Sequence, residues 1–595
     1  MGTYLSPGVY VEEVSGGVKP IAGVGTSTGA FVGIAEKGVI GKAMLVTNWT
    51  QFVKEFGGFI PNGYLAYAVY GFFAEGGTSC YVVRAASDSA VKSSKMITVD
   101  KEASTTIKDK DGISAVDVLK VTARLGGIAG NNITVIIDDP ADADPTHFKL
   151  TVGGNVFDDA TIANIIDSIN NDVSAPINVA KINDERPLNG SYNLSGGSDA
   201  VDVLKVTARS EGIWGNRITV KIEDPSEKPA TTHFKFTVKY AEAAGFKEEY
   251  EGEGVSEIFD NVKMQDVEDK INGVSAFIKV EVADNKRPLN GSYDLSGGVD
   301  GVQDADFTGD ANNKKGLHAF DEVDDINIVA VPDKAGDPEV IMAGLNYCKQ
   351  RKDCFFVADA PYGLIPTKVV EFRKATGEYA GNAFNSSYGA LYYPWVYIND
   401  PLTGKKKLIP PSGVVAGTYA YTDSARGVHK APAGISEGYL DSVVGIERII
   451  TKGEHDVLNP AQVNVIRSLP AGLCIWGART LSADSEWMYI NVRRLLLYIE
   501  ESIDEGTQWV VFEPNDAALW GKVKRNLTAF LTRVWRDGAL FGATPEEAFF
   551  VKVDEENNPS EVRDAGQLII EVGVAPVKPA EFVIIRISQK TLAKA

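Results

Sequence analysis

The sequence is poor in the residues that most often bind metals or act as nucleophiles. Its 595 residues include only four cysteines and five histidines. The cysteines form neither a CxxC pair nor a zinc spacing, so we expect free, mostly buried thiols. His147 and His233 occupy equivalent positions of a repeat, which indicates a packing role, and the other three histidines are isolated. We therefore expect no metal and no cofactor.

Long apolar runs are also missing. No stretch of about twenty apolar residues suggests a membrane span, and the opening residues MGTYLSPGVYVEE lack the basic and apolar regions of an export signal. The formal net charge of −21 argues against nucleic acid or an anionic membrane as the main partner. We expect a protein that is made in the cytoplasm, with no nucleic-acid partner and no direct membrane insertion.

Motifs of common enzyme classes are absent as well. No Walker loop GxxxxGK[ST], HExxH or GxSxG occurs, and GVGTSTG (23–29) has the wrong spacing for a dinucleotide loop. Asp333 and Asp359 lie at the ends of two adjacent predicted parallel strands, where α/β enzymes place catalytic groups. Aspartates at such positions also commonly cap a helix or a turn. A soluble α/β enzyme with a site at this pair of aspartates therefore stays open as an alternative.

What the sequence does contain is an internal repeat. The segment VDVLKVTAR begins at Val116 and again at Val201, and RPLNGSY begins at Arg186 and again at Arg287. Each copy has short alternating runs and one predicted helix, at 158–170 in the first copy and at 257–272 in the second. This pattern predicts two tandem α+β modules, at 113–198 and 199–300, each of normal domain size.

The segments that flank the repeat have a different sequence pattern. Apolar runs bounded by turn residues predict a parallel sheet, and amphipathic segments between them predict helices. The predicted strands are 29–36, 80–86, 326–332 and 354–361, and the predicted helices are 48–57, 62–77 and 337–352. The chain is therefore expected to be a multidomain α/β and α+β protein whose core is interrupted by the two modules.

Two long helices are predicted near the end, at 485–506 and 516–540. The second carries an apolar stripe, and four basic residues lie largely off it: Lys522, Arg525, Arg533 and Arg536. Strand-like alternation occurs at both ends of the sequence, in 4–14 and in 581–588. The three lysines within 400–410 suggest the exposed tip of a hairpin.

Several long motifs resemble the tail sheath family of contractile phage tails and related contractile injection systems. They include IPPSGVVAGTYAYTDSARGVHKAPAG (409–434), the long segment 510–554 that contains EPNDAALWGKVKRNLTAFLTRVWRDGALFGATPEEAFF, and VGVAPVKPAEFVIIRISQ (572–589). YLSPGVYVEE near the start resembles the same family's opening. The resemblance covers roughly the first 90 and the last 270 residues and says little about the repeated modules.

This resemblance implies a structural subunit with an α/β sheath core, C-terminal helices and strand-donating arms. Copies would form stacked hexameric rings around an inner tube in a metastable extended state, and contraction would drive the tube through a target envelope. The implied partners are other copies, the inner tail tube protein, and baseplate and tail terminator proteins, all assembled in the bacterial cytoplasm as part of a phage tail or contractile particle. The implied divisions are 1–20 (N-terminal arm), 21–100 and 301–440 (core), 441–575 (tube-facing domain) and 576–595 (C-terminal arm).

The resemblance also suggests which residues act between subunits. The arms add strands to a neighbour's sheet, so backbone groups provide affinity and alternating side chains provide register. The expected anchors are Tyr4, Val9, Val11, Val14, Phe582, Ile584 and Ile587. Lys522, Arg525, Arg533 and Arg536 are expected to face the tube, although a solvated helix face explains them equally well. A surface-layer or adhesive repeat protein remains a further alternative.

Overall fold

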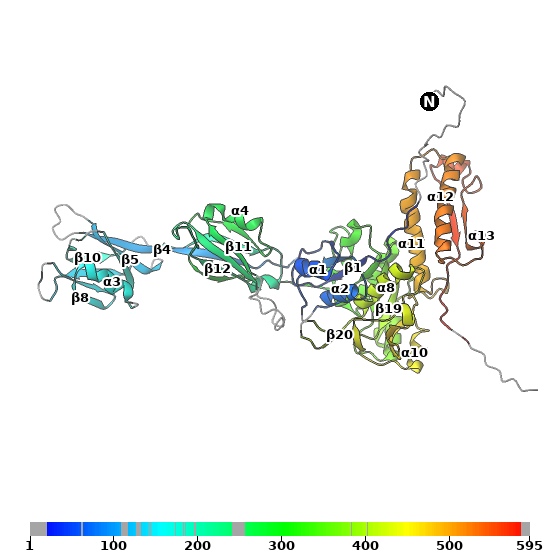
Figure 1. Cartoon of the computed structure of the whole chain (residues 1–595), viewed down its shortest axis with the longest axis horizontal. Helices are drawn as coiled ribbons and strands as arrows, with labels where there is room; N and C mark the ends of the chain where they lie inside the picture. Colours follow the sequence, from blue (N-terminus) through cyan, green and yellow to red (C-terminus); the bar gives the residue numbers. More distant parts are fainter. Residues whose placement is uncertain are drawn as a thin grey trace, which may run out of the picture. The chain divides into compact units, whose positions relative to one another are not determined.

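A computed structural model describes residues 21–60, 63–87, 89–108, 117–126, 132–141, 144, 146–172, 174–182, 184, 186–194, 198–240, 256–381, 383–401, 403–582 and 584. Its contacts divide the chain into two units (Figure 1). The insert unit is Ser89–Asp300, and the core unit combines Met1–Asp88 with Gly301–Ala595. The core unit is therefore discontinuous in sequence, as the change of sequence pattern on either side of the repeat predicts.

The core unit is built on an eight-stranded sheet in the order β2-β3-β1-β17-β18-β19-β23-β24. Neighbouring strands from β3 to β23 pair in parallel, and the outermost strands β2 and β24 pair antiparallel. The residues of β1, β17, β18 and β19 are buried throughout, as expected for parallel strands covered on both faces. The strands are β1 (Gly29–Gly33), β2 (Met44–Val46), β3 (Cys80–Arg84), β17 (Ile328–Ala330), β18 (Phe355–Asp359), β19 (Gly389–Tyr393), β23 (Val463–Leu469) and β24 (Gly472–Ile475).

Two apolar clusters, one on each face of the sheet, hold the helices in place. One cluster contains α1 (Trp49–Phe56), α2 (Leu65–Ala74) and α8 (Ser412–Arg426), and the other contains α6 (Pro338–Arg351) and α7 (Pro366–Lys374). Helices α2 and α8 approach closely because α8 has a glycine at their contact. A Cβ on Gly413 would lie 2.3 Å from the Cα of Ala68.

Smaller elements complete this part of the core unit. Strands β20 (Val396–Asn399), β21 (Lys406–Ile409) and β22 (Val443–Ile446) form a separate sheet in the order β21-β20-β22. Strands β20 and β21 are a hairpin, as predicted for 400–410, but two of the three lysines lie in β21 rather than at the tip. The remaining short helices are α5 (Ala305–Thr308), η4 (Gly316–Glu322), η5 (Pro332–Lys334), η6 (Gly377–Tyr379), α9 (Gly434–Glu437) and α10 (Lys452–Leu458).

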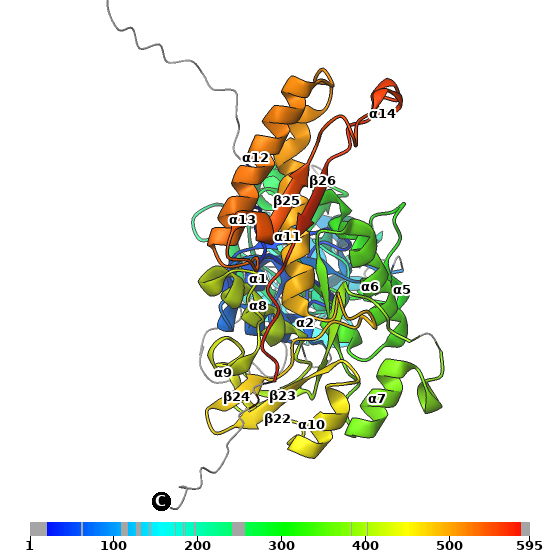
Figure 2. The ribbon, with the colours of Figure 1, turned by 90° about the vertical axis from the view of Figure 1, so that its right-hand side faces the viewer.

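The last part of the core unit is a layer of two long helices and a small sheet (Figure 2). Helix α11 is Ile490–Thr507 and α12 is Ala517–Arg536, where the Asp516 side chain accepts a hydrogen bond from the Leu519 N–H and caps the helix. The predicted stripe of α12 is buried in one apolar cluster with strand β25 (Phe549–Lys552). Strand β25 pairs antiparallel with β26 (Glu571–Val574). Short helices η7 (Gln508–Val510), α13 (Pro545–Ala548) and α14 (Ser560–Asp564) complete the layer.

The insert unit contains two copies of one fold, as the sequence repeat predicts. The sheet β10-β6-β7-β8 of the first copy corresponds to β16-β12-β13-β14 of the second. The first copy has β5 (Asp117–Gly126), β6 (Thr134–Asp138), β7 (Phe148–Val152), β8 (Asn155–Ala160), α3 (Ile162–Asn171), β9 (Ile177–Lys181) and β10 (Gly190–Asn193). The second has β11 (Ser198–Ala208), η2 (Ile213–Arg217), β12 (Ile218–Glu223), β13 (Phe234–Tyr240), β14 (Ser256–Val262), η3 (Met264–Asp266), α4 (Val267–Asn272), β15 (Ile278–Val282) and β16 (Gly291–Asp294).

One predicted helix in the second copy is wrong over its first half. Residues 257–262 lie in strand β14 and pair antiparallel with β13, and the α-helix begins only at Val267. The equivalent strand β8 pairs with β7 in the first copy. Pairing along β13 satisfies the backbone groups of this segment, and this long-range contact outweighs its helix-like spacing.

Strand β4 (Ser94–Lys108) connects the two copies in a way that the repeat does not predict. Its first half pairs with β11 of the second copy, where Met96 is opposite Lys205. Its second half pairs with β5 of the first copy, where Thr105 is opposite Val121. The second copy is therefore built from segments before and after the first one in the chain.

An arginine at the same position of each copy binds the backbone of the repeated histidine. Arg186 donates from Nε to the backbone carbonyl of His147 at 2.6 Å, and Arg287 donates to that of His233 at 2.9 Å. Each arginine also reaches an aspartate, which is Asp139 in the first copy and Asp224 in the second. The two positions thus accept the same backbone hydrogen bond in each copy, and the packing role of the histidine side chains stays a prediction.

Candidate functional site

Asp333, the first half of the predicted aspartate pair, binds backbone amides. It follows β17, and its carboxylate accepts hydrogen bonds from the N–H of Ile34, at 2.6 Å, and from the N–H of Tyr64. The carboxylate thus joins the end of β1 to the start of α2. A Cβ on Gly33 would lie 2.3 Å from Asp333 Oδ2, so this contact requires glycine. Burial raises the pKa of Asp333 to about 6, although the backbone donors oppose the shift.

Asp359, the second aspartate of the pair, caps the start of helix α8. It ends β18, is 3% exposed, and accepts the N–H of Ser412 at 2.7 Å, at the first turn of α8. Burial raises the pKa of this carboxyl to about 7. The structure places both aspartates at the ends of adjacent parallel strands, as predicted, but each one caps a separate element. This geometry matches the capping interpretation.

The described residues offer few other reactive groups. All four cysteines are free and buried, as predicted, and the sulfurs of Cys348 and Cys354 lie 3.4 Å apart. Among these residues no group of three or more His, Cys, Asp or Glu side chains could hold a metal ion. A search of the same residues finds no helix with the length and apolar character needed to cross a membrane.

The four basic residues predicted to face the tube differ in their contacts on α12. Lys522, Arg525 and Arg536 are exposed. Arg533 is exposed as well, and its guanidinium also donates to the backbone carbonyl of Ile21, which is buried against α11 and α12. All four predicted tube-facing residues are thus exposed on the helix, and Arg533 in addition connects the N-terminal part of the described chain to it.

The structure describes only two of the seven predicted arm residues. Tyr4, Val9, Val11, Val14 and Ile587 lie outside the described residues. The side chains of Phe582 and Ile584 are 71% and 78% exposed.

The sheet that precedes the C-terminal arm has two strands in the described part of the chain, so β25 and β26 each present an unpaired edge. Phe550 on β25 is 57% exposed. An isolated pair of strands is marginally stable, and open edges readily accept another strand.

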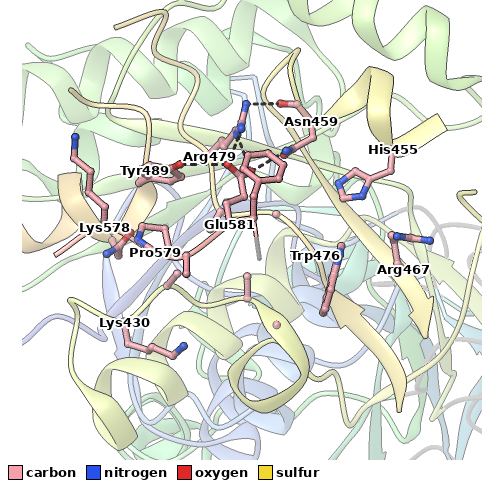
Figure 3. Close-up of a pocket in the computed structure, with 18 of the residues that line it drawn as sticks. Lys430, His455, Asn459, Arg467, Trp476, Arg479, Tyr489, Lys578, Pro579 and Glu581 are labelled. Atoms are coloured by element: carbon pink, nitrogen blue, oxygen red, sulfur yellow. Dashed lines mark hydrogen bonds and ion pairs between the residues drawn. The ribbon is translucent and has the colours of Figure 1, made fainter. Parts of the chain in front are cut away.

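Just before the exposed residues, Glu581 fastens the chain to its own core unit (Figure 3). Its carboxylate accepts two hydrogen bonds from Arg479, at 2.9 and 2.6 Å, one from Asn459 Nδ2 at 2.7 Å and one from the Tyr489 hydroxyl at 3.3 Å. Burial alone would raise the pKa of Glu581, but the hydrogen bonds from Arg479 and Asn459 outweigh it and lower the pKa.

The sequence analysis placed Glu581 in the segment that is expected to bind a neighbouring copy. In the structure, Glu581 forms its hydrogen bonds with residues of its own chain. The exposed part begins after it. The three partners of Glu581 come from distant segments, and no sequence motif marks them.

A polar pocket surrounds this fastening. The pocket has a volume of about 780 Å³ and lies between α9, α10, β23 and the segment that follows β26. Asn491, which is 2% exposed, forms part of its wall and donates from Nδ2 to the carbonyls of His429, at 2.8 Å, and Val577, at 3.1 Å. The side chains that give the pocket its character are Lys430, Lys452, His455, Asn459, Arg467, Trp476, Arg479, Lys578 and Glu581.

Comparison with known proteins identifies the core unit. The family model described as phage tail sheath protein central domain matches residues 306–481, and the one described as phage tail sheath C-terminal domain matches residues 482–590. The tail sheath protein of Vibrio phage KVP40 is 25% identical over 334 residues, which cover 52% of this chain and 48% of the relative. The tail sheath protein of Burkholderia phage BcepMu is 29% identical over 237 residues, which cover 38% of this chain and 47% of the relative.

The chain thus spans about half the length of these two curated relatives. Among solved structures, an extracellular contractile injection system, the PVC sheath complex in its contracted state, matches 99% of both chains with a TM-score of 0.51 at 18% identity. That match concerns the fold. Since two successive sheath domains match in order and the curated relatives are sheath proteins, residues 306–590 of the chain belong to the phage tail sheath family.

Proposed function

We propose that the chain is a structural, non-enzymatic subunit of a contractile tail sheath. Its copies polymerise as stacked hexameric rings around an inner tube. The extended packing is metastable and contracts to drive the tube through a target envelope. The observation that carries this proposal is the match of residues 306–590 to both sheath domains in order.

The joint between subunits is strand addition by the two arms. The two-stranded sheet β25–β26 supports this, because its outer edges are unpaired in the described part of the chain and Phe550 leaves apolar surface exposed beside them. Backbone N–H and C=O groups of an incoming arm satisfy such an edge. The exposed side chains of Phe582 and Ile584, beyond the fastened Glu581, are suited to bind a neighbouring copy.

The face toward the inner tube is the exposed edge of α12. Lys522, Arg525 and Arg536 form a row of cations that meets acidic groups on the tube protein. Solvent-exposed ion pairs are individually weak, typically about 1 kcal/mol or less, so this contact releases easily when the sheath contracts. Baseplate and tail terminator proteins bind the two ends of the sheath.

Contraction proceeds by rearrangement of interfaces between rigid subunits rather than by nucleotide hydrolysis. The arms keep the subunits connected during the movement. The two capping aspartates support a structural role as well, because their carboxylates are engaged by backbone amides of separate elements.

Electron microscopy of the purified protein tests this function. We expect negative-stain images of the full chain to show long cylinders or stacked rings. Deletion of residues 1–14 should leave folded particles that no longer polymerise, and Phe582→Asp should weaken polymerisation. Lys405→Asp, in the exposed hairpin loop, is a matched control that should assemble normally. A full chain that stays monomeric at high concentration, or a truncated chain that still forms cylinders, contradicts the proposal.

A further inference from the structure

The repeated segment RPLNGSY contains an Asn-Gly pair in each copy, Asn189-Gly190 in the first and Asn290-Gly291 in the second. Such a pair is prone to deamidation, because glycine has no Cβ and its backbone nitrogen can reach the amide carbon of the preceding asparagine. Both asparagines are exposed to water. Since the segment has the same sequence in both copies, a difference between the two pairs has to come from the fold.

The backbone around the two pairs is the same. Each glycine is the first residue of a strand, β10 or β16, and lies opposite an isoleucine of β6 or β12. In each copy a tyrosine of that strand donates from its hydroxyl to the carbonyl of the leucine before the asparagine, at 2.7 Å in the first copy and 2.9 Å in the second. Both strands lie at a sheet edge in the described part of the chain, where the first residue opens most readily.

The side-chain amides of the two asparagines differ. Asn290 is held at both ends, because its Oδ1 accepts from Arg287 Nη2 at 2.7 Å and its Nδ2 donates to Asp224 Oδ1 at 2.8 Å. Arg287 also donates to Asp224 at 2.9 Å, so the three side chains hold one another. Asn189 forms no hydrogen bond with another described residue, although its copy has the equivalent arginine–aspartate pair at 2.8 Å. The Asn189 amide is therefore free to turn toward the Gly190 nitrogen.

We propose that Asn189 is a site of spontaneous deamidation in the folded protein and that Asn290 is protected from it. The Gly190 nitrogen loses its proton to solvent base and bonds to Cγ of Asn189. The Cγ–Nδ2 bond breaks, and the amide nitrogen takes up a proton and leaves as ammonia while a succinimide ring closes. Water then opens the ring and leaves aspartate or isoaspartate. This inference does not depend on the proposed sheath function.

The reaction changes the start of β10. It places a carboxylate where the neutral amide was, and isoaspartate also adds a methylene group to the backbone. The longer backbone moves the first residues of β10 out of register with β6. The equivalent strand β16 keeps its pairing, so the two copies come to differ as the protein ages.

Peptide mapping by mass spectrometry measures the conversion of each asparagine in the folded full chain, incubated at mildly alkaline pH in water labelled with heavy oxygen. We expect the peptide that contains Asn189 to take up solvent oxygen and to contain isoaspartate, which forms only through the ring. Asn189 should convert about tenfold faster than Asn290 or more, since the two hydrogen bonds from Asn290 to charged groups are worth at least that factor.

The unfolded chain is the matched control, because the two segments have the same sequence. In concentrated guanidinium chloride the hydrogen bonds of Asn290 are lost, and both asparagines should convert at rates within about twofold of each other. A preference for Asn189 that persists in the unfolded chain would mean that the fold does not cause it.

Three substitutions test the cause. Gly190→Ala should slow the conversion of Asn189 about tenfold, because a methyl group restricts the conformations in which the nitrogen reaches Cγ. The fold has room for it, since the added Cβ would lie 3.5 Å from the ring of Tyr192. Asp224→Ala removes one partner of Asn290 and should speed its conversion about fivefold. The equivalent Asp139→Ala should leave Asn189 within about twofold of its wild-type rate, because this asparagine has no bond to lose.

Thermal unfolding of each variant checks that it is folded, and the wild-type comparison decides the proposal even where a variant is not. Equal conversion of the two asparagines in the folded chain, conversion without isoaspartate, or no conversion of Asn189 overturns the proposal. Each of these results can occur whether or not the chain forms cylinders, so a failure here is distinguishable from a failure of the sheath function.

Discussion

Arg494 on α11 and Asp423 on α8 form a bidentate ion pair in the interior of the core unit, with N–O distances of 2.9 and 2.6 Å. Their side chains are 3% and 2% exposed. Arg494 also donates to the backbone carbonyl of Thr26 at 2.8 Å and lies over the ring of Tyr419. This arginine therefore connects the C-terminal helices, the sheet-covering helix α8 and the N-terminal segment.

Removal of Arg494 should destabilise the core unit strongly. Arg494→Ala leaves the Asp423 carboxylate buried without its cation, which typically costs about 3–5 kcal/mol. We expect a large fall in the denaturant midpoint of the core unit, whereas Arg525→Ala on the exposed face of α12 should change it little. An Arg494→Ala protein that unfolds at the wild-type midpoint would show that the pair is energetically neutral.

The capping aspartates should make stability depend on pH. The folded-state pKa is about 7 for Asp359 and about 6 for Asp333, both above the ordinary value of 3.8. Between pH 4 and pH 7 the folded chain thus holds protons that the unfolded chain has released, so stability falls as pH rises, by about 1.4 kcal/mol per pH unit for each group over its own window.

A substitution at Asp359 isolates this effect. In Asp359→Asn the amide oxygen still accepts the Ser412 N–H, so we expect near wild-type stability at pH 5, higher stability than wild type at pH 8 and a flatter pH profile. Asp359→Ala loses the acceptor and should be less stable than Asp359→Asn at both pH values. Urea denaturation at several pH values measures this, and an unchanged slope for Asp359→Asn would show that the carboxyl is ionised in the folded chain.

The fastening of Glu581 should protect the segment before the C-terminal arm. Glu581→Gln removes the charge that pairs with Arg479 and should let the segment detach more often. We expect the Val577 amide, which donates to the carbonyl of Ala539, to exchange with solvent about tenfold faster. Hydrogen exchange with mass spectrometry measures this, with exposed Glu555→Gln as the control. Equal exchange in both variants would mean that the ion pair does not hold the segment.

Strand β4 allows a test of how the two repeats are connected. Ile97 precedes the first copy in sequence but is fully buried in the apolar core of the second. Ile97→Ala should destabilise the second copy by about 2–5 kcal/mol. Hydrogen exchange should therefore accelerate in β12 and β13 but much less in β6 and β7. Faster exchange confined to the first copy would contradict the shared-strand arrangement.

The local sequence pattern was sufficient to predict the elements that depend mainly on interactions between residues close in sequence. The apolar runs at β1, β17 and β18 predicted buried parallel strands, and the stripe of α12 predicted which side chains are buried. The duplicated segments predicted two copies of one fold, and the long C-terminal motifs predicted the family. Each of these features depends on spacing or identity within a few dozen residues.

The tertiary structure decided what depends on contacts between distant segments. Whether residues 257–262 form a helix or a strand was settled by pairing with β13, and the shared strand β4 depends on partners from two copies. Glu581 meets Arg479 only because the chain folds back across the core unit. The spacing of apolar side chains along the sequence indicates which face of a helix or strand is buried. Ion pairs and pairing between strand edges depend instead on which distant segments the fold places next to each other.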